Sequence, residues 1–316
     1  MKAAYIESFT SQGNIQVGQL PEPEVADHEI CIAVSFAGVN PADAKIAEGL
    51  FQTRMPHRFP LILGWEAAGI VHRLGQGVTS FKKGDKVYTY CRKPLLHAGT
   101  WAEYVTFSAD HGALAPKNLS LAQAAAIPLA GLTAWQALFE KMQLQRGEKI
   151  LIHGGGGGVG GFAIQWAKIH GAVVITTASA AKSDYVLGLG ADEVIDYQRR
   201  PFGEQIKQSH PSGIDLVFDT IGGAVYKESF AVLKPSGRLL SIREQPDVDL
   251  AQKYKIRAEY LFVTPNGKQL QKITELFDQG KAKPPVIHKM PLDQAAKAIE
   301  EIRKGHTQGK IVLQIQ

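Results

Sequence analysis

The first third of the chain alternates hydrophobic and polar positions in short runs. Glu29 to Phe36 reads as a strand in which Ile30, Ile32 and Val34 recur at every second position. Ala68–Leu74 and Lys86–Tyr90 are further strand candidates, and glycine-rich turn signals separate them. Short strands with long connections predict a barrel-like antiparallel domain.

From about residue 120 the hydrophobic pattern changes, and strand and helix candidates alternate. Strands are predicted at 150–153, 172–177, 193–196, 215–219, 237–242 and 259–263, and helices at 159–170, 180–189 and 224–233. This alternation predicts βαβ units forming a parallel sheet with helices on both faces. A helix ending near 278, a short strand, a helix at 292–303 and a last strand at 310–315 are expected to close the chain.

A glycine run joins the strand at 150–153 to the helix at 159–170, and within it Gly155, Gly157 and Gly160 fit the pattern G-x-G-x-x-G. A tight strand-to-helix turn needs a residue that tolerates positive φ, and a pyrophosphate can approach only backbone without side chains. The helix N-terminus adds free N–H groups and a partial positive charge. A flexible glycine loop is the alternative, but the flanking strand and helix favour dinucleotide binding. The predicted phosphate-binding residues are Gly155, Gly156, Gly157, Gly158, Val159 and Gly160.

The end of the second strand of such a domain selects between NAD and NADP. An acidic residue there binds the ribose hydroxyls of NAD and repels a 2′-phosphate. Here the strand ends in Thr177-Ala178-Ser179, and no acid follows until Asp184. Ser179 can donate to a phosphate and Lys182 can neutralise it, although Lys182 could also be an exposed helix lysine. NADPH is therefore the predicted cofactor.

Composition sets broad limits. The 316 residues are 45% hydrophobic and 21% charged, with a formal net charge of +5 and no basic run, so neither a nucleic acid nor a membrane partner is expected. The apolar run 119–139 is alanine-rich and interrupted by Pro128 and Gly131, which favours a helix outside the membrane. Two cysteines and the lack of an apolar leader at Met1 favour a reducing compartment, and we expect a cytoplasmic protein.

Several motifs in fixed order carry a family resemblance. They are the segments 37–43 (AGVNPAD), 59–69 (FPLILGWEAAG), 84–87 (GDKV), 99–104 (GTWAEY), 128–134 (PLAGLTA), the glycine run, 189–197 (LGADEVIDY), 218–223 (FDTIGG) and 309–313 (GKIVL). In this order the chain resembles the zinc-independent medium-chain dehydrogenase/reductases of the quinone oxidoreductase (zeta-crystallin-like) type, over essentially its whole length. The resemblance implies an α/β fold in which a GroES-like catalytic domain (1–120 and 265–316) accompanies a Rossmann NADP-binding domain (121–264), and a homodimer.

The resemblance also implies roles for individual residues. Asn40 and Asp43 match positions beside the nicotinamide, and Thr133 matches one near its carboxamide; these three are the candidate catalytic residues. Ala178, Lys182 and Tyr197 match positions around the 2′-phosphate, and Lys310 in the last motif is a further cofactor contact. Asn-Pro-Ala-Asp is also a good turn or helix-start sequence, so turn chemistry remains an alternative for Asn40 and Asp43.

Zinc-dependent relatives have a cysteine in the early loop and a histidine in a Gly-His-Glu motif. Here Asn40–Asp43 holds no cysteine and Trp65 takes the histidine position, so no metal site is expected. Without a Lewis acid, an activated acceptor is favoured: a quinone or an α,β-unsaturated carbonyl. The alternatives are a zinc-type alcohol dehydrogenase and a non-catalytic NADPH-binding protein.

Five further residues have open roles at this level. Tyr88 and Tyr90 could supply a proton, although tyrosines in strands usually pack in the core. Arg243-Glu244 could place charge near the nicotinamide and narrow the range of acceptors, or could be a surface pair. His153 is expected to be a structural histidine at the end of a buried strand.

Overall fold

The computed structural model describes residues 1–10 and 14–316, which divide into two compact units. Unit 1 comprises Met1–Leu132 and Thr264–Gln316, and unit 2 comprises Thr133–Val263. We expected the first boundary after residue 120; in the structure the following segment, up to Leu132, packs with unit 1.

Unit 1 is built around the long strand β3 (Glu29–Val39), which pairs with three neighbours. Its main sheet has the order β15-β16-β3-β5-β6-β8, with β7 also paired to β3, and a three-stranded sheet has the order β2-β1-β4. The pairs are antiparallel except β15 with β16. The other strands are β1 (Lys2–Ile6), β2 (Gln16–Gln19), β4 (Leu61–Ile62), β5 (Glu66–Leu74), β6 (Lys86–Tyr90), β7 (Tyr104–Ser108), β8 (Gly112–Leu114), β15 (Ile287–Pro291) and β16 (Lys310–Gln314).

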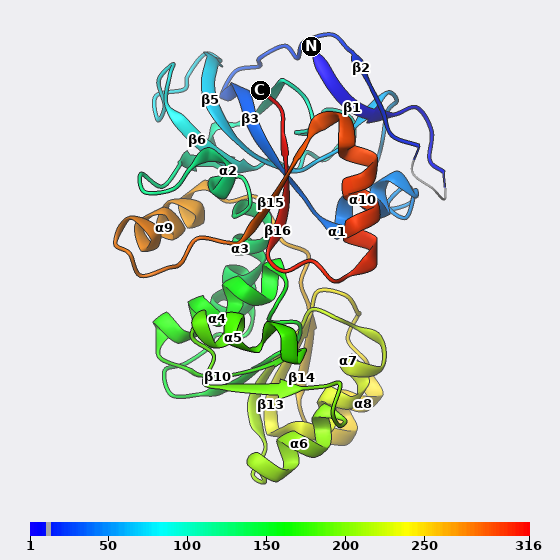
Figure 1. The fold of residues 1–316 in the computed structure, drawn as a ribbon, viewed down its shortest axis with the longest axis vertical. Coiled ribbons are helices and arrows are strands. Elements are labelled where there is room, and N and C mark those ends of the chain that lie inside the picture. The colour runs from blue at the N-terminus through cyan, green and yellow to red at the C-terminus, as the bar shows by residue number, and fades with distance from the viewer. Residues whose placement is uncertain (11–13) are drawn as a thin grey trace. The chain divides into compact units, whose positions relative to one another are not determined.

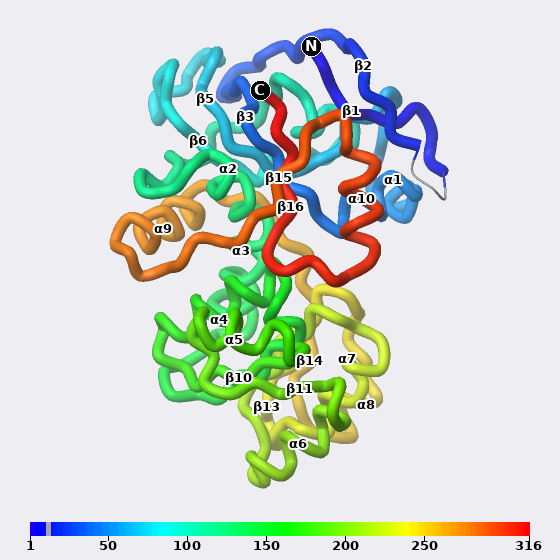
Figure 2. Tube along the Cα trace, in the orientation of Figure 1, coloured from blue at the N-terminus to red at the C-terminus, as the bar shows by residue number. Residues whose placement is uncertain are grey.

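The two ends of the chain meet in unit 1. Figure 2 shows the red C-terminal segment beside the blue N-terminal strands, and in the pairing of β16 with β3 Ile311 lies opposite Val39. This pairing brings Lys310 to the end of β3, where Asn40 begins the next helix. The helices of unit 1 are α1 (Pro41–Ala47), α2 (Leu121–Ala124), α9 (Gly267–Asp278) and α10 (Ala295–Lys304).

Unit 2 contains one parallel sheet of order β11-β10-β9-β12-β13-β14, of which Figure 1 labels β10, β13 and β14. Strand order reverses beside β9, so the carboxyl ends of β9 and β12 flank the switch point at which such sheets bind ligands. Its strands are β9 (Lys149–Ile152), β10 (Val173–Ala178), β11 (Glu193–Asp196), β12 (Ile214–Asp219), β13 (Leu233–Ser241) and β14 (Arg257–Tyr260). Its helices are α4 (Gly158–His170), α5 (Ser183–Gly188), α6 (Phe202–Ser209), α7 (Gly223–Ser229) and α8 (Val248–Tyr254).

The predicted two-part α/β architecture is confirmed, with corrections in detail. The strand expected at 259–263 lies at Arg257–Tyr260, and α6 and α8 were not predicted. Helix α6 buries only Phe202 and Ile206, so its hydrophobic pattern is too sparse to indicate a helix. The apolar segment 119–139 forms α2, then α3 (Pro128–Trp135), which runs into a π-helix at Gln136–Lys141. No helix among the described residues is long and apolar enough to cross a membrane.

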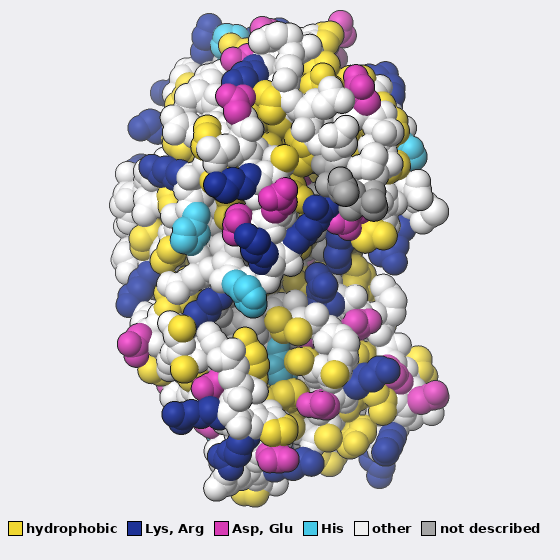
Figure 3. All heavy atoms as spheres, turned by 45° about the vertical axis from the view of Figure 1, so that its right-hand side comes forward, with side chains coloured by type: hydrophobic (Ala, Val, Ile, Leu, Met, Phe, Trp, Pro, Cys, Tyr) yellow, Lys and Arg dark blue, Asp and Glu magenta, His cyan; other side chains and the backbone are white. Residues whose placement is uncertain are grey.

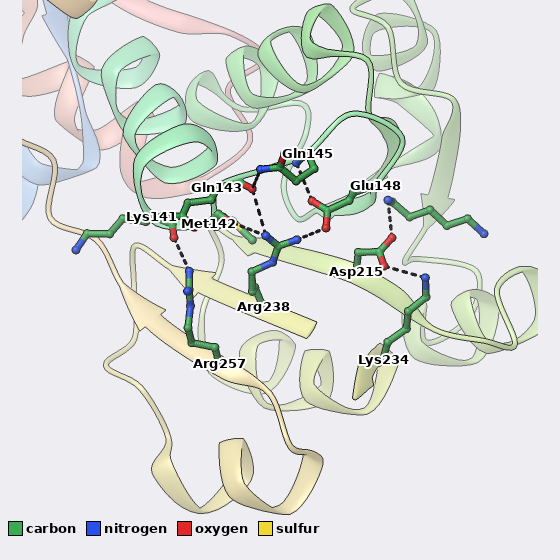
Figure 4. Close-up of polar contacts among 10 residues, drawn as sticks. Lys141, Met142, Gln143, Gln145, Glu148, Asp215, Lys234, Arg238 and Arg257 are labelled. Carbon is green, nitrogen blue, oxygen red and sulfur yellow. Dashed lines mark hydrogen bonds and ion pairs between the residues drawn. The ribbon is translucent and has the colours of Figure 1, made fainter. Parts of the chain in front are cut away.

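Charged side chains tie the amino-terminal edge of the unit 2 sheet to the π-helix (Figure 4). Arg238 on β13 donates to the carbonyls of Met142 and Gln143 and pairs with Glu148, so the free carbonyls at the helix end have donors. Asp215 accepts from the Lys149 N–H and from Lys234. These contacts occupy the edge opposite the glycine run. On the face drawn in Figure 3, basic and acidic side chains are interspersed.

Candidate functional site

The glycine run of unit 2 forms a tight loop between β9 and α4. Gly154 has a φ of 72°, so the left-handed residue of the turn lies one position before the first glycine of the motif. The Gly154 N–H donates to Thr177 Oγ1 at 3.1 Å, and the Gly155 N–H donates to the Thr177 carbonyl at 3.2 Å. The end of β10 therefore fixes the entry of the loop.

The rest of the loop leaves donors available. The Gly157 N–H donates to the Gly154 carbonyl at 3.0 Å, whereas the N–H groups of Gly156, Val159 and Gly160 have no acceptor among the described residues of unit 2. They lie at the N-terminus of α4, which spans Gly158–His170, where the helix dipole favours an anion. The loop therefore offers a pyrophosphate-binding arrangement.

The absence of side chains in this loop is required at several positions. A Cβ at Gly160 would lie 2.3 Å from the Gly154 carbonyl oxygen, so only glycine permits this approach of helix to loop. A Cβ at Gly155 would lie 2.1 Å from Thr176 Oγ1, and one at Gly156 would lie 2.5 Å from Lys182 Cδ. Neighbouring side chains thus explain why glycine is required at Gly155 and Gly156. At Gly157 the nearest atom would be 3.4 Å away, which is ordinary contact.

The region expected to select the cofactor lies at the end of β10. Ala178 ends the strand, Ser179 follows it, and the Lys182 stem crosses over Gly156, which places this lysine beside the phosphate loop. Partial burial lowers the pKa of Lys182. Tyr197 is 54% exposed after β11. One acid is near: Asp196 lies opposite Ala178, but its carboxylate accepts from the Gln198 N–H and faces Arg199 at 3.7 Å.

In unit 1, Asn40 and Lys310 belong to a buried polar cluster with Glu66. Glu66 Oε1 accepts from Asn40 Nδ2 at 2.8 Å and from Lys310 Nζ at 2.7 Å, and Oε2 accepts from the Leu129 N–H at 2.7 Å. Lys310 Nζ also donates to the Val39 carbonyl and to Asn40 Oδ1. The three protons of the ammonium thus have three protein acceptors. Asn40 keeps one amide hydrogen beyond these bonds.

Asp43 lies one turn further, in the first turn of α1. Its Oδ2 accepts from the Asn40 N–H at 2.7 Å, while Oδ1 has no hydrogen-bond partner among the described residues and the side chain is fully buried. Burial raises the pKa of Asp43 to about 7, against the lowering effect of the Asn40 N–H and of Lys310. The carboxyl therefore holds a proton over part of the neutral range.

The structure gathers the predicted residues into two groups. Asn40, Asp43 and Lys310 lie together in unit 1, and the glycine loop lies with Ala178, Ser179 and Lys182 in unit 2. Thr133 begins unit 2 within α3 and is 3% exposed. Glu66 was not singled out from the sequence as part of this cluster, because its partners come from distant parts of the chain and leave no local signal.

The structure shows the surroundings of three residues with open roles, Tyr88, Arg243 and Glu244. Tyr88 is buried, with its hydroxyl bonded to the Leu270 carbonyl and to Thr274, which is a packing role. Arg243 and Glu244 do not pair with each other in the described structure: Glu244 accepts from the Gly223 N–H at 2.9 Å, at the start of α7. Arg243 is exposed, directly after β13.

No group of three histidine, cysteine, aspartate or glutamate side chains that could hold a metal occurs among residues 1–10 and 14–316. Three side chains of metal-ligand type in unit 1 each contact another protein group. Glu66 pairs with Lys310, and His97 contacts Arg58. The Cys91 thiol faces the Trp65 carbonyl at 3.5 Å.

Two family models match the chain. Residues 26–117 match the alcohol dehydrogenase GroES-like domain, and residues 189–313 match the zinc-binding dehydrogenase family. The first lies within unit 1, and the second begins in unit 2 and ends in β16. Together they confirm a GroES-like domain beside a Rossmann-like parallel-sheet domain.

Similar proteins extend this match to nearly the full length. The chain is 33% identical over 307 residues to the chloroplast envelope quinone oxidoreductase homolog of Arabidopsis thaliana, covering 94% of this chain and 92% of that protein. It is 34% identical over 318 residues to the NADPH-dependent alkenal/one oxidoreductase, chloroplastic, of the same plant, covering 96% and 78%. The structure of the quinone oxidoreductase from Coxiella burnetii has a TM-score of 0.88 at 32% identity, covering 100% and 99%. The chain therefore belongs to the medium-chain dehydrogenase/reductase family, among its quinone oxidoreductases.

Proposed function

We propose that the protein is an NADPH-dependent oxidoreductase that transfers hydride to a quinone or an α,β-unsaturated carbonyl without a metal. The observation that carries this proposal is the loop Gly154–Gly160, with N–H donors at the start of α4 and Lys182 placed over Gly156. Relatives named quinone oxidoreductase and NADPH-dependent alkenal/one oxidoreductase support the same reaction class.

The loop fits the cofactor because a Cβ at Gly160 or Gly155 would collide with the loop or with β10. The N–H groups of Gly156, Val159 and Gly160 would hold the pyrophosphate. Ser179, Lys182 and Tyr197 would hold the 2′-phosphate, and the absence of an acid at Ala178 avoids repelling it. The bound cofactor supplies the hydride.

The proposed acceptor class follows from the side chains that the chain does not offer. Reducing a simple ketone requires a group that stabilises an alkoxide, commonly a zinc ion with three protein ligands. Trp65 occupies the expected histidine position, and Glu66 is neutralised by Lys310. Quinones and enones spread the incoming charge onto an oxygen, so orientation, exclusion of water and hydrogen bonding suffice.

Asn40 and Asp43 are proposed to act beside the nicotinamide, and Thr133 near its carboxamide. The remaining amide hydrogen of Asn40 could donate one bond to a ligand, whereas Asp43 acts through Asn40 by accepting its N–H. Lys310 is proposed to position Asn40 and Glu66 without contacting the ligand itself, because all of its donors already have protein acceptors. We also propose that the protein is a cytoplasmic homodimer whose substrate is a small molecule, without a nucleic-acid or membrane partner.

An acceptor panel tests the proposed function. NADPH oxidation is followed with a naphthoquinone, an ortho-quinone, a simple enone, an alkenal and a primary alcohol with NADP⁺, with and without a chelator. We expect turnover of at least one quinone or enone that the chelator leaves unchanged. Tight NADPH binding without turnover of any acceptor would instead indicate a non-catalytic binding protein. Alcohol oxidation that the chelator abolishes would indicate the zinc-type enzyme.

Arg243 is proposed to influence the acceptor range. It follows β13 at the carboxyl edge of the sheet, and its Cβ lies 3.0 Å from where a Cβ of Gly222 would stand. Because Glu244 is held by the Gly223 N–H, the two side chains do not neutralise each other as a surface pair. Arg243→Gln should lower kcat/KM for acceptors with a carboxylate more than for neutral ones. Equal effects on both would reject this role.

A further inference from the structure

His153 follows β9 directly and is 1% exposed, yet no step of the proposed reaction uses it. Both ring nitrogens have partners: Nδ1 lies 3.2 Å from Thr177 Oγ1, and Nε2 lies 3.0 Å from Ser229 Oγ. Phe202 packs edge-on against the ring, with centroids 4.6 Å apart, and so restricts the ring plane. Burial lowers the pKa of His153 to about 4, so the ring is neutral near pH 7.

Hydrogen-bond accounting fixes which nitrogen carries the proton. Ser229 has one hydroxyl hydrogen, which it donates to the Val225 carbonyl at 2.6 Å. Ser229 Oγ can therefore only accept from the ring, which places the proton of His153 on Nε2. Nδ1 is then an acceptor, and it accepts from the Thr177 hydroxyl.

The Thr177 hydroxyl connects the ring of His153 to the glycine loop. Because Thr177 Oγ1 donates to Nδ1, its lone pairs face the Gly154 N–H, which donates to it at 3.1 Å. Gly154 is the left-handed residue that opens the loop, and the next N–H, that of Gly155, is held by the Thr177 carbonyl. Thr220 Oγ1 also donates to the His153 carbonyl at 2.8 Å, which anchors the backbone of the histidine itself.

We propose that His153 is a positioning residue for cofactor binding: through the Thr177 hydroxyl it holds Gly154, and hence the glycine loop, in the conformation that receives the pyrophosphate. This inference rests on the proposed cofactor site, but not on the acceptor or on turnover. It assigns to His153 an effect on NADPH affinity that a histidine filling the core would not have.

Matched substitutions test the relay. The side-chain oxygen of asparagine can take the place of Nδ1, so His153→Asn keeps an acceptor for Thr177. His153→Gln carries its amide near the Nε2 position and keeps only the Ser229 side. Thr177→Ser keeps the hydroxyl, and Thr177→Val removes it at nearly constant volume. Thr274→Val removes a buried hydroxyl in unit 1 and controls for loss of stability alone.

The readout is the Kd for NADPH, measured by direct titration of the folded protein, with the thermal midpoint recorded for each variant. We expect His153→Gln and Thr177→Val each to raise Kd by about tenfold, the loss of one buried hydrogen bond, and the double variant to be no weaker than either single one. His153→Asn, Thr177→Ser and Thr274→Val should stay within about twofold of the parent. An unchanged Kd in Thr177→Val, or strict additivity in the double variant, would overturn the proposal.

A second measurement needs no variant to fold. The ¹⁵N chemical shifts of the His153 ring in the parent protein should show a neutral imidazole with its proton on Nε2. A proton on Nδ1 would overturn the relay. Failure of the parent to bind NADPH at all would instead reject the proposed function, so the two failures are distinguishable.

Discussion

Lys310 Nζ lies 2.7 Å from Glu66 Oε1, with the two side chains 5% and 0% exposed. A charge pair buried this deeply needs its partners, because each ion has lost its hydration. Here the carboxylate also accepts from Asn40 and the Leu129 N–H, and the ammonium donates to Val39 and Asn40. The pair therefore organises the polar core of unit 1.

Removing one member of the Lys310–Glu66 pair should reduce the free energy of unfolding more than removing both. Lys310→Met leaves the Glu66 carboxyl buried without its counter-charge, and we expect a loss of about 3–5 kcal/mol in the free energy of unfolding. The double variant Lys310→Met/Glu66→Gln should recover part of that loss. Urea unfolding of the three proteins measures this. A single variant as stable as the parent would show that the pair does not hold unit 1 together.

Alanine substitutions along the glycine loop should differ sharply. Gly160→Ala puts a Cβ against the backbone oxygen of Gly154, which cannot move without reshaping the loop, so we expect loss of NADPH binding and of stability. Gly157→Ala meets nothing closer than 3.4 Å and should bind nearly normally. Titration with NADPH and thermal unfolding check both. Equal tolerance at the two positions would contradict the loop geometry.

Gly156→Ala tests a different contact in the same loop. The added Cβ meets the flexible stem of Lys182 rather than backbone, so the fold should be kept while Lys182 is displaced. We expect little change in the thermal midpoint. The affinity for NADPH should fall more, relative to the parent, than the affinity for NADH. Equal weakening of both cofactors would mean that Lys182 does not reach the 2′-phosphate.

Substituting Lys182 itself gives the complementary result. Lys182→Ala should weaken the binding of NADPH by about tenfold or more and leave the binding of NADH nearly unchanged. The reason is that the 2′-phosphate of NADPH loses a charge-assisted hydrogen bond that NADH never makes. Lys207→Ala, an exposed lysine on α6, is the matched control for the change in net charge. Similar losses in the two variants would reject a specific phosphate contact.

Asp43 should make stability depend on pH. Its pKa is raised to about 7 in the folded protein, above the value of about 3.9 expected in the unfolded chain. As the pH rises, the unfolded chain therefore loses this proton at a lower pH than the folded protein does. Stability contributed by this group is present below about pH 4 and is lost, by a few kcal/mol, as the pH rises to about 7. Asp43→Asn should remove this loss, whereas Asp249→Asn on exposed α8 should not. Urea unfolding across this range decides; parallel profiles for Asp43→Asn and the parent would contradict the assignment.

The sequence predicts well those features whose cause is local. The strand β9, the glycine loop and α4 follow each other within one segment, so the glycine pattern and the hydrophobic period are enough to predict this strand–loop–helix unit. The same holds for the absence of an acid after β10. The expected structural character of His153 also agrees with its burial between Thr177 and Ser229.

The features that local patterns miss depend on distant residues. In the sequence, Lys310 is a predicted cofactor contact through its motif alone. Its contacts with Glu66 and Asn40 leave no local signal, because these partners come from the other end of the chain. The need for glycine at 155 and at 156 is explained by the neighbouring side chains of Thr176 and Lys182. Helix α6 was missed because its two buried side chains give too weak a periodic signal.

The proposed reaction is direct hydride transfer from NADPH to an activated acceptor without metal. The most direct measurement uses NADPH deuterated at the transferred position with a simple enone, on enzyme treated with chelator and assayed for metal in the same sample. We predict deuterium on the β-carbon of the saturated ketone, formed at the rate of untreated enzyme. Unlabelled product would rule out direct hydride transfer, and activity that falls with the metal content would rule out a reaction without metal.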